Sequence, residues 1–346
     1  MTNLSVLDSN LILVFFLLNL PIILFFNQIT LRFNIYDKND NKRKLHTHPI
    51  SLFGGTIILY NFIICISIGY IFNFSLFDNN FLNDNREIFA FIFGSIFFFL
   101  LGLFDDKYVL NSNKKFFFSL IIIYLIISLD ESLILNEIKF LNFNKIELFG
   151  FSKPFSILCF LLFLNALNMF DGINLQVALY SILLFIIFLL KGININFNLI
   201  ILFSLILFLY FNYRNKCFLG DSGSNILFFI ISCTIIKNYN INTNFQIEEI
   251  FILMFLPGLD MFRLFLFRLI RGNNPFKADN SHIHHLLYKI FKNKTYVALI
   301  LFVVNFLVIL NYYFVNFKLI YCIFIFIIYF ISIYFIYSKI KFNENL

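Results

Sequence analysis

Two neighbouring aspartates, Asp105 and Asp106, end an apolar run, and their types and adjacency suggest chemistry. Adjacent carboxylates repel each other, and their desolvation near hydrocarbon is unfavourable. A bound divalent cation, or a proton held by one carboxyl group, would remove that conflict. The pair therefore suits a hard-cation site or a general base, whereas a helix end exposed to water is the structural alternative.

A third aspartate, Asp221, lies in the string Gly220-Asp221-Ser222-Gly223-Ser224, just before another apolar run. Free N–H groups at a helix N-terminus, in a loop of glycine and serine, let the backbone approach phosphate oxygens. The Asp221 carboxylate would repel a phosphate, so it suits a metal ion that in turn meets the phosphates. An ordinary capped turn explains the same string without a ligand.

Three histidines are concentrated in the string His282-Ile283-His284-His285. Zinc is a poor fit, because the five cysteines are scattered along the chain and offer no ligand pair. Basic neighbours such as Lys277 and Lys289 suit an anion better, and imidazoles can donate hydrogen bonds to pyrophosphate or uracil oxygens. The string therefore favours an anionic substrate over a metal.

Two further groups of charges have both a functional and a structural explanation. Arg43 and His46 lie in a basic string that fits either an anion contact or a signal for membrane orientation. Asp260 and Arg263 stand three residues apart inside an apolar run. They fit either a structural ion pair that faces the bundle interior or a pair that supports the site.

The elements that carry these residues are membrane-spanning helices. The 346 residues are 60% hydrophobic, more than the core of a soluble protein can absorb. Apolar runs long enough to cross about 30 Å of hydrocarbon recur along the chain, and they predict an all-α, polytopic membrane protein with a single transmembrane domain over 1–346. The eleven expected spans cover roughly 10–31, 51–72, 88–104, 115–130, 154–170, 174–191, 197–212, 222–237, 249–269, 296–314 and 317–338.

Basic residues set the orientation of these spans. Alternate polar segments hold 19 of the 26 Lys and Arg residues, and the positive-inside rule places those segments in the cytoplasm. The N-terminus then faces out and the C-terminus faces the cytoplasm. The polar clusters fall on this one face, which indicates a single site built from several loops. Those loops lie near 32–50, 105–115, 165–174, 212–224 and 270–295.

Five strings, in this order, resemble those of the polyprenyl-phosphate N-acetylhexosamine-1-phosphate transferases of the glycosyltransferase family 4 type. The strings are Lys42–His46, Gly102–Asp106, Asn165–Asn174, Gly220–Ser224 and Pro275–His285. The last string is the most specific. It resembles the bacterial branch that loads N-acetylglucosamine phosphate onto undecaprenyl phosphate, and it differs from the loop of the muramyl-pentapeptide transferases.

The resemblance implies roles for the matching residues. The residues implied at the catalytic centre or along the pyrophosphate are Asp105, Asp106, His282, His284 and His285. Those implied in substrate binding are Lys115, Arg43, His46, Asp171 and Asn174. A Mg²⁺ ion, or Mn²⁺ in its place, would be held by Asp221 with help from Asn168.

The resemblance also implies the reaction. The enzyme would transfer a HexNAc-1-phosphate, GlcNAc-1-phosphate in this branch, from a UDP-sugar to undecaprenyl or another polyprenyl phosphate and release UMP. Such a reaction starts a lipid-linked glycan of the cell envelope. It would place the protein in the inner membrane with its active site on the cytoplasmic face, and with no nucleic-acid partner.

One matching position departs from the family. The usual D-G-x-D-G reads Asp171-Gly172-Ile173-Asn174-Leu175 here, so an amide replaces a carboxylate. Asparagine can still donate to and accept from a uracil, but it is a weaker metal ligand than aspartate. Eukaryotic relatives also carry Asn at the matching place, so the change is compatible with activity.

Two functions of other classes remain open. A transporter or flippase also has many spans and charges within the membrane. In such a protein, however, the charges should lie near the bilayer midplane, and broken helices should occur at corresponding places in two halves of the chain. The other is an inactive scaffold of the same family, for which Asn174 is the only hint. The sugar, the glycan pathway and a homodimeric state are not determined by the sequence.

Overall fold

The computed structural model describes residues 9–37, 48–71, 76–78, 81–241, 245–272 and 281–344. Two of the strings singled out above therefore lie wholly or partly outside the described residues. These are the basic string with Arg43 and His46, and the stretch from Pro275 to Asp279.

Helices make up most of the described chain, which confirms the expectation of a mainly helical, polytopic membrane protein. The helices are α1 Ser9–Leu24, α2 Phe26–Phe33, α3 Gly54–Ile71, α4 Asn85–Tyr108, α5 Ser112–Leu129, α6 Ser152–Phe170, α7 Gln176–Leu190, α8 Ile195–Tyr213, α9 Gly220–Ile241, α10 Ile247–Leu253, α11 Phe255–Ile270, α12 Ile283–Phe291, α13 Lys294–Phe314 and α14 Lys318–Glu344. Two short antiparallel ladders join β1 Tyr36–Asp37 to β2 Ile50–Ser51, and β3 Glu137–Ile138 to β4 Ile146–Glu147.

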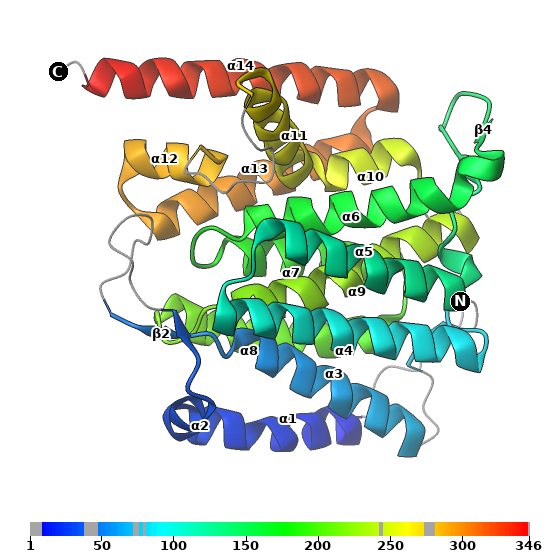
Figure 1. Ribbon diagram of the computed structural model, residues 1–346, viewed down its shortest axis with the longest axis vertical. Coiled ribbons are helices and arrows are strands. Elements are labelled where there is room, and N and C mark those ends of the chain that lie inside the picture. Colours follow the sequence, from blue (N-terminus) through cyan, green and yellow to red (C-terminus); the bar gives the residue numbers. More distant parts are fainter. Residues whose placement is uncertain are drawn as a thin grey trace.

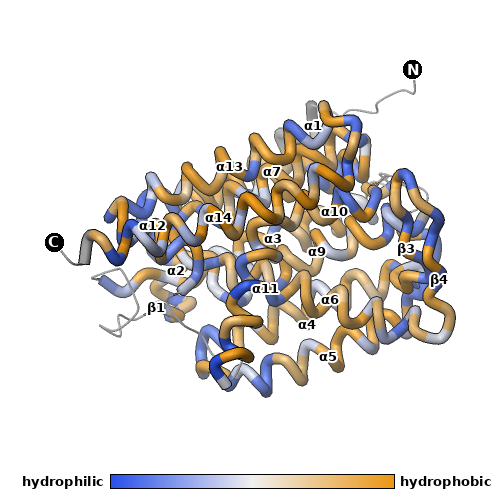
Figure 2. Tube along the Cα trace, turned by 90° about the horizontal axis from the view of Figure 1, so that it is seen from above, coloured by the Kyte–Doolittle hydropathy of each residue, from blue (hydrophilic) through white to orange (hydrophobic). Residues whose placement is uncertain are grey.

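Within the described ranges, seven helices are long and apolar enough to cross a membrane, or up to nine if each bent pair counts as one span. The bent pairs are α1 with α2, at 69°, and α10 with α11, at 80°. Most helices run side by side, whereas α11 stands across them (Figure 1). Apolar residues cover much of the bundle along its length (Figure 2), as lipid contact requires.

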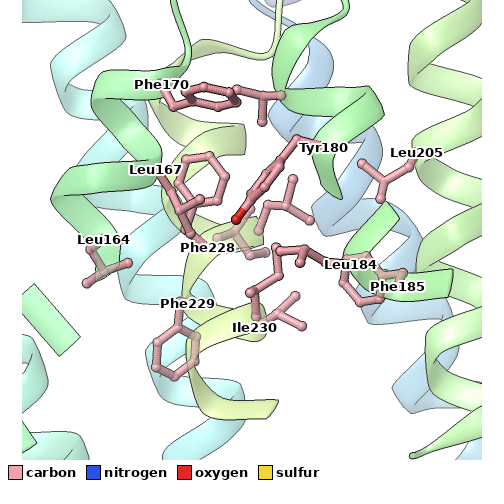
Figure 3. Packing of buried hydrophobic residues seen from close by; sticks show 14 of the residues in the cluster. Leu164, Leu167, Phe170, Tyr180, Leu184, Phe185, Leu205, Phe228, Phe229 and Ile230 are labelled. Atoms are coloured by element: carbon pink, nitrogen blue, oxygen red, sulfur yellow. The ribbon is translucent and has the colours of Figure 1, made fainter. Parts of the chain in front are cut away.

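Helix α9 forms the centre of the bundle, and its side chains from Ser222 to Tyr239 are all buried. Phe228, Phe229 and Ile230 of this helix pack among side chains of α6 and α7 (Figure 3). Because this helix is enclosed on all sides, it provides a fixed support for the residues at its N-terminus.

Glycines bring two neighbouring helices close to the backbone of α9. A Cβ atom on Gly55 of α3 would lie 2.4 Å from the backbone nitrogen of Gly223. A Cβ atom on Gly102 of α4 would lie 2.2 Å from the carbonyl oxygen of Asp221. Such small-residue contacts allow close helix packing in membranes. As a result, the last turn of α4 lies directly beside the first turn of α9.

A buried ion cluster joins the opposite ends of the same helices. The Lys237 side chain is fully buried in α9, and its Nζ lies 2.7 Å from Glu87 Oε2 and 2.8 Å from Asp130 Oδ2. It also donates to the carbonyl oxygen of Phe81 at 2.8 Å. These contacts compensate a charge that would otherwise be very unfavourable inside the bundle. The cluster holds α4, α5 and α9 together far along the helices from Asp221.

Candidate functional site

The two adjacent aspartates at the end of α4 have different partners. Asp106 accepts hydrogen bonds from the backbone nitrogens of Asp221, at 2.8 Å, and Ser222, at 3.0 Å. Its carboxylate therefore caps the N-terminus of α9, where free N–H groups and the helix dipole stabilise a negative charge. Gly220, just before, has a φ of +72°, and a Cβ atom there would lie 2.7 Å from Asp106 Oδ2.

Asp105, in contrast, faces Lys115 in the first turn of α5. Its Oδ2 lies 2.8 Å from Lys115 Nζ, which also lies 3.1 Å from Asp221 Oδ2. The amide of Asn168 in α6, oriented to satisfy both neighbours, donates to Asp221 Oδ1 at 2.9 Å and accepts from Lys115 at 2.8 Å. The ammonium group of Lys115 in α5 thus contacts one side chain from each of three other helices, α4, α6 and α9. We call Asp105, Lys115, Asn168 and Asp221 the four-helix cluster.

A cleft of about 500 Å³ opens beside this cluster. Asp171, which ends α6, lines the cleft together with Asp105 and Asp221. Burial, and then the negative charges of Asp221 and Asp106, raise the pKa of Asp171 to about 7. The crowded carboxylates therefore repel one another, and a bound proton or a bound cation would relieve this repulsion.

Asn174, the residue that departs from the family pattern, lies at the wall of the same cleft. Its Nδ2 donates to the side-chain oxygen of Asn215 and lies 3.5 Å from the carbonyl oxygen of Asn212. The Asn212 side chain accepts from the backbone nitrogen of Leu175 at 2.7 Å. An ionised carboxylate has no donor group, so an aspartate at position 174 could not make these hydrogen bonds.

Sequence reasoning did not single out Asn212 and Asn215 as members of the site. They lie at the end of α8, in the segment 212–224 that the sequence assigned to the site as a loop. The only available signal was their position between an apolar run and the Asp221 string. Asparagine is common in such connections for structural reasons, so its type alone did not distinguish it.

The three histidines differ in their surroundings. His285 lines the cleft. His284 is buried against the Asp171–Asn174 segment, where a Cβ atom on Gly172 would lie 1.8 Å from its Nε2. His282 is buried as well, and its Nδ1 lies 2.8 Å from Asp260 Oδ2. Burial, followed by the two neighbouring histidines, lowers the pKa of His284 well below its usual range, so this imidazole is neutral near pH 7.

The donors at this site fit a hard divalent cation such as Mg²⁺. The carboxylates of Asp105, Asp171 and Asp221 and the amide of Asn168 all present oxygen ligands, which Mg²⁺ prefers. Among the residues that the structure describes, no three acidic, His or Cys side chains form a metal site by themselves. Mg²⁺ commonly takes only one or two protein carboxylates, with substrate phosphates and water completing its shell. The residues present are consistent with that mode of binding.

Replacing Asp106 with asparagine should destabilise the fold. Asparagine offers one acceptor oxygen where Asp106 uses two, so an N–H group of α9 would lose its partner. We expect a loss of about 1–3 kcal/mol in the free energy of unfolding, seen as a lower thermal midpoint in detergent. The matched variant Asp105→Asn should lower the midpoint less, because Lys115 keeps Asp221 and Asn168 as partners. Equal midpoints for both variants would contradict the capping role of Asp106.

The chain also resembles known proteins. Residues 88–238 match the model of glycosyl transferase family 4. The probable undecaprenyl-phosphate N-acetylglucosaminyl 1-phosphate transferase of Bacillus subtilis (strain 168) is 25% identical over 289 residues, which cover 81% of this chain and 77% of that protein. The undecaprenyl-phosphate alpha-N-acetylglucosaminyl 1-phosphate transferase of Escherichia coli (strain K12) is 31% identical over 78 residues, 22% of this chain and 21% of that protein.

The undecaprenyl-phosphate alpha-N-acetylglucosaminyl 1-phosphate transferase of Pasteurella multocida (strain Pm70) gives a similarly short match. It is 30% identical over 84 residues, 23% of this chain and 22% of that protein. The matched segment of the family model holds most of α4, all of α5 and α6, and most of α9, and so every residue of the four-helix cluster. Over this segment, which includes the candidate site, the chain resembles glycosyl transferase family 4.

Proposed function

We propose that the protein transfers an N-acetylhexosamine-1-phosphate, N-acetylglucosamine-1-phosphate in the first instance, from a UDP-sugar to undecaprenyl or another polyprenyl phosphate, with release of UMP. The observation that carries this proposal is the four-helix cluster beside the cleft. A membrane protein that resembles family 4, and that collects carboxylates and an ammonium group at one end of its bundle, is suited to joining two phosphorylated molecules. Its helices in turn offer an apolar surface to a prenyl chain.

In the proposed reaction, an oxygen of the lipid phosphate attacks the phosphorus nearest the sugar. A new P–O bond forms, the bond to the bridging pyrophosphate oxygen breaks, and UMP leaves. Both reactants are anions, so charge repulsion is the main barrier. Lys115 would stabilise the transferred phosphate, and His285, which lines the cleft, would donate to the pyrophosphate or the sugar.

Asp105 would orient the lipid phosphate or accept a proton from it, since its carboxylate lies beside Lys115. Asp106 would act through α9, whose N-terminus it caps. Asp221 and Asn168 would hold Mg²⁺, which supplies a positive charge to the pyrophosphate. Asp171 and Asn174 would face the nucleotide. Arg43 and His46 stay proposed substrate contacts, although they lie outside the described residues.

We further propose eleven passes, with the N-terminus outside, the C-terminus in the cytoplasm and the site at the cytoplasmic face of the inner membrane. This number counts each bent pair as one pass and adds the shorter α7 and the enclosed α9 to the helices of spanning length. The four-helix cluster, which gathers helix termini at one end, supports a site at one face. An impermeant thiol reagent applied to intact cells should then label Asn144→Cys in the β3–β4 connection. It should not label Asn111→Cys between α4 and α5, and the reverse pattern would contradict the orientation.

The purified protein, incubated with undecaprenyl phosphate, Mg²⁺ and a panel of radiolabelled UDP-sugars, tests the reaction. We expect equimolar release of UMP and labelled lipid, with UDP-GlcNAc among the accepted donors. Omission of the lipid phosphate should stop both, because the nucleophile is then absent. No labelled lipid with any donor would overturn the proposal, and a lipid labelled only from another UDP-sugar would change the substrate but retain the reaction.

A further inference from the structure

A buried aspartate outside the cleft, Asp260 in α11, gathers donors from three separate segments. Its Oδ1 accepts from Arg263 Nη2 at 2.7 Å and from the Tyr329 hydroxyl at 3.0 Å. Its Oδ2 lies 2.8 Å from His282 Nδ1. Since Asp260 is only 2% exposed, its carboxylate depends on these donors to offset its desolvation. We call Asp260, Arg263 and Tyr329 the carboxylate hub.

Arg263, the cationic member of the hub, connects Asp260 to two further segments of the chain. Its Nη2 also donates to the carbonyl oxygen of Ser281 at 2.7 Å, directly before the histidine string. Its Nε and Nη1 each lie 3.3 Å from a hydroxyl of α14, those of Tyr329 and Tyr337. One ion pair thus fastens α11, the start of the histidine string and the last helix to one another. Figure 1 shows α14 running across the direction of α11.

The hub determines how His282 is held. An ionised carboxylate can only accept hydrogen bonds, so the Nδ1 of His282 must carry the proton. The backbone nitrogen of Ile283 also points to Asp260, at 3.2 Å from its Oδ1. Ring and backbone are therefore both fixed at the N-terminus of α12, with the ring in a single orientation.

From His282 the packing leads to the cleft in two steps. The rings of His282 and His284 are nearly parallel, with centroids 5.5 Å apart. The rings of His284 and His285 are 4.3 Å apart, and His285 lines the cleft. Because the middle ring is buried against Gly172, a displacement of His282 would be passed on to His285 and to the Asp171–Asn174 segment.

We infer that the carboxylate hub positions the histidine string for the transfer reaction, so that α14 acts on the cleft through Tyr329, Asp260 and His282. The inference rests on the proposed function and adds positioning residues to it. Asp260 and Tyr329 are not placed against substrate. They act by holding the rings that reach it. The hub also lies outside residues 88–238, the segment matched by the family model.

A purely structural ion pair would give a different result from a positioning hub. Such a pair would stabilise α11 against α14, and its loss would lower the thermal midpoint without a selective change in turnover. A positioning hub should change turnover at an unchanged fold. It should also depend on His285, the ring that it serves. Rate measurements and a double-mutant cycle separate the two roles.

The variant Tyr329→Phe removes one hydroxyl group from the hub and leaves the ring in place. We expect kcat for UMP release to fall on the order of tenfold, as the loss of a supporting hydrogen bond does at other sites, with the KM for the UDP-sugar unchanged. The thermal midpoint should fall as well, because a buried hydrogen bond to Asp260 is lost, and the rate is therefore measured well below that midpoint. The matched control is Tyr334→Phe on the same helix, whose side chain is 70% exposed. This control should retain the wild-type kcat.

The cycle adds the same change to a His285→Asn background. If the hub acts through the histidine string, Tyr329→Phe should have little further effect there, whereas independent effects would multiply. An active wild type whose kcat is unaffected by Tyr329→Phe, or a fully multiplicative cycle, would overturn the inference alone. A wild type that releases no UMP would overturn the proposed function and the inference together.

Discussion

The variant Asp221→Asn is expected to release UMP at least about 1,000-fold more slowly than the wild type. The substitution removes the negative charge that faces Lys115 and that would hold the cation beside the pyrophosphate. Asparagine has nearly the same shape and can still contact Asn168, but it no longer neutralises Lys115 or holds a cation firmly. The rate should be measured in detergent with UDP-GlcNAc and undecaprenyl phosphate. Folding is followed by the thermal midpoint and should remain close to that of the wild type.

Two further variants make the result specific. Glu147→Gln removes an exposed carboxylate in the β3–β4 hairpin, away from the cleft, and should leave the rate unchanged. Asp105→Asn removes the other carboxylate that contacts Lys115, and it should cause a loss comparable to that of Asp221→Asn. Near-normal turnover in both Asp105→Asn and Asp221→Asn would show that the four-helix cluster is not the reaction centre.

The sequence anticipated that the polar strings end or begin apolar helices, and the four-helix cluster follows from this. Helices that cross a bilayer in alternate directions bring their ends to two levels only. The end of α4, the start of α5, the end of α6 and the start of α9 were therefore expected at the same level. Which side chains touch within that level depends on helix rotation, which hydropathy does not determine.

The pair at the end of α4 illustrates this limit. Neighbouring residues on an α-helix point about 100° apart, so the side chains of Asp105 and Asp106 leave the helix in different directions. In the structure one turns to Lys115 and the other to the N-terminus of α9. From the sequence the two carboxylates were equivalent. Which carboxylate caps α9 depends on the close packing at Gly102, which brings α9 beside α4.

The histidine string illustrates it again. The family resemblance placed His282, His284 and His285 together along the pyrophosphate, yet a single ring of the three lines the cleft. The partner that fixes His282 comes from α11, and the tyrosine that supports this partner comes from α14. Contacts between helices so distant in sequence leave no signature in the spacing of one string.

The bend before α11 had a sequence signal that hydropathy does not detect. The segment 249–269 was expected as one span, and the structure divides it into α10 and α11 at an angle of 80°. Pro257 lies in the first turn of α11, where its missing N–H group does not interrupt a helix. A proline inside a continuous helix would be unfavourable, so its presence favours a helix start at this position. The bend lies just before Asp260, so the hub begins where α11 departs from the direction of α10.

Removal of divalent cations with excess EDTA is expected to abolish UMP release, and added Mg²⁺ or Mn²⁺ should restore it. The wall of the cleft already carries the carboxylates of Asp105, Asp171 and Asp221, and Lys115 is the one cationic side chain of the four-helix cluster. A substrate pyrophosphate would add more negative charge to this surface. Burial, and then the charges of Asp221 and Asp106, raise the pKa of Asp171, so crowding by carboxylates is part of this shift. A divalent cation shared by protein and pyrophosphate would offset the repulsion.

A binding measurement separates this metal role from a role in the chemical step alone. UDP-GlcNAc should raise the thermal midpoint of the wild type in Mg²⁺ but not in EDTA, because a ligand that binds only the folded state stabilises it. In Asp221→Asn the Mg²⁺-dependent shift should shrink, whereas in Glu147→Gln it should persist. Full turnover in excess chelator would exclude the metal. An equal midpoint shift with and without Mg²⁺ would show that the pyrophosphate is held by Lys115 and its neighbours without a shared cation.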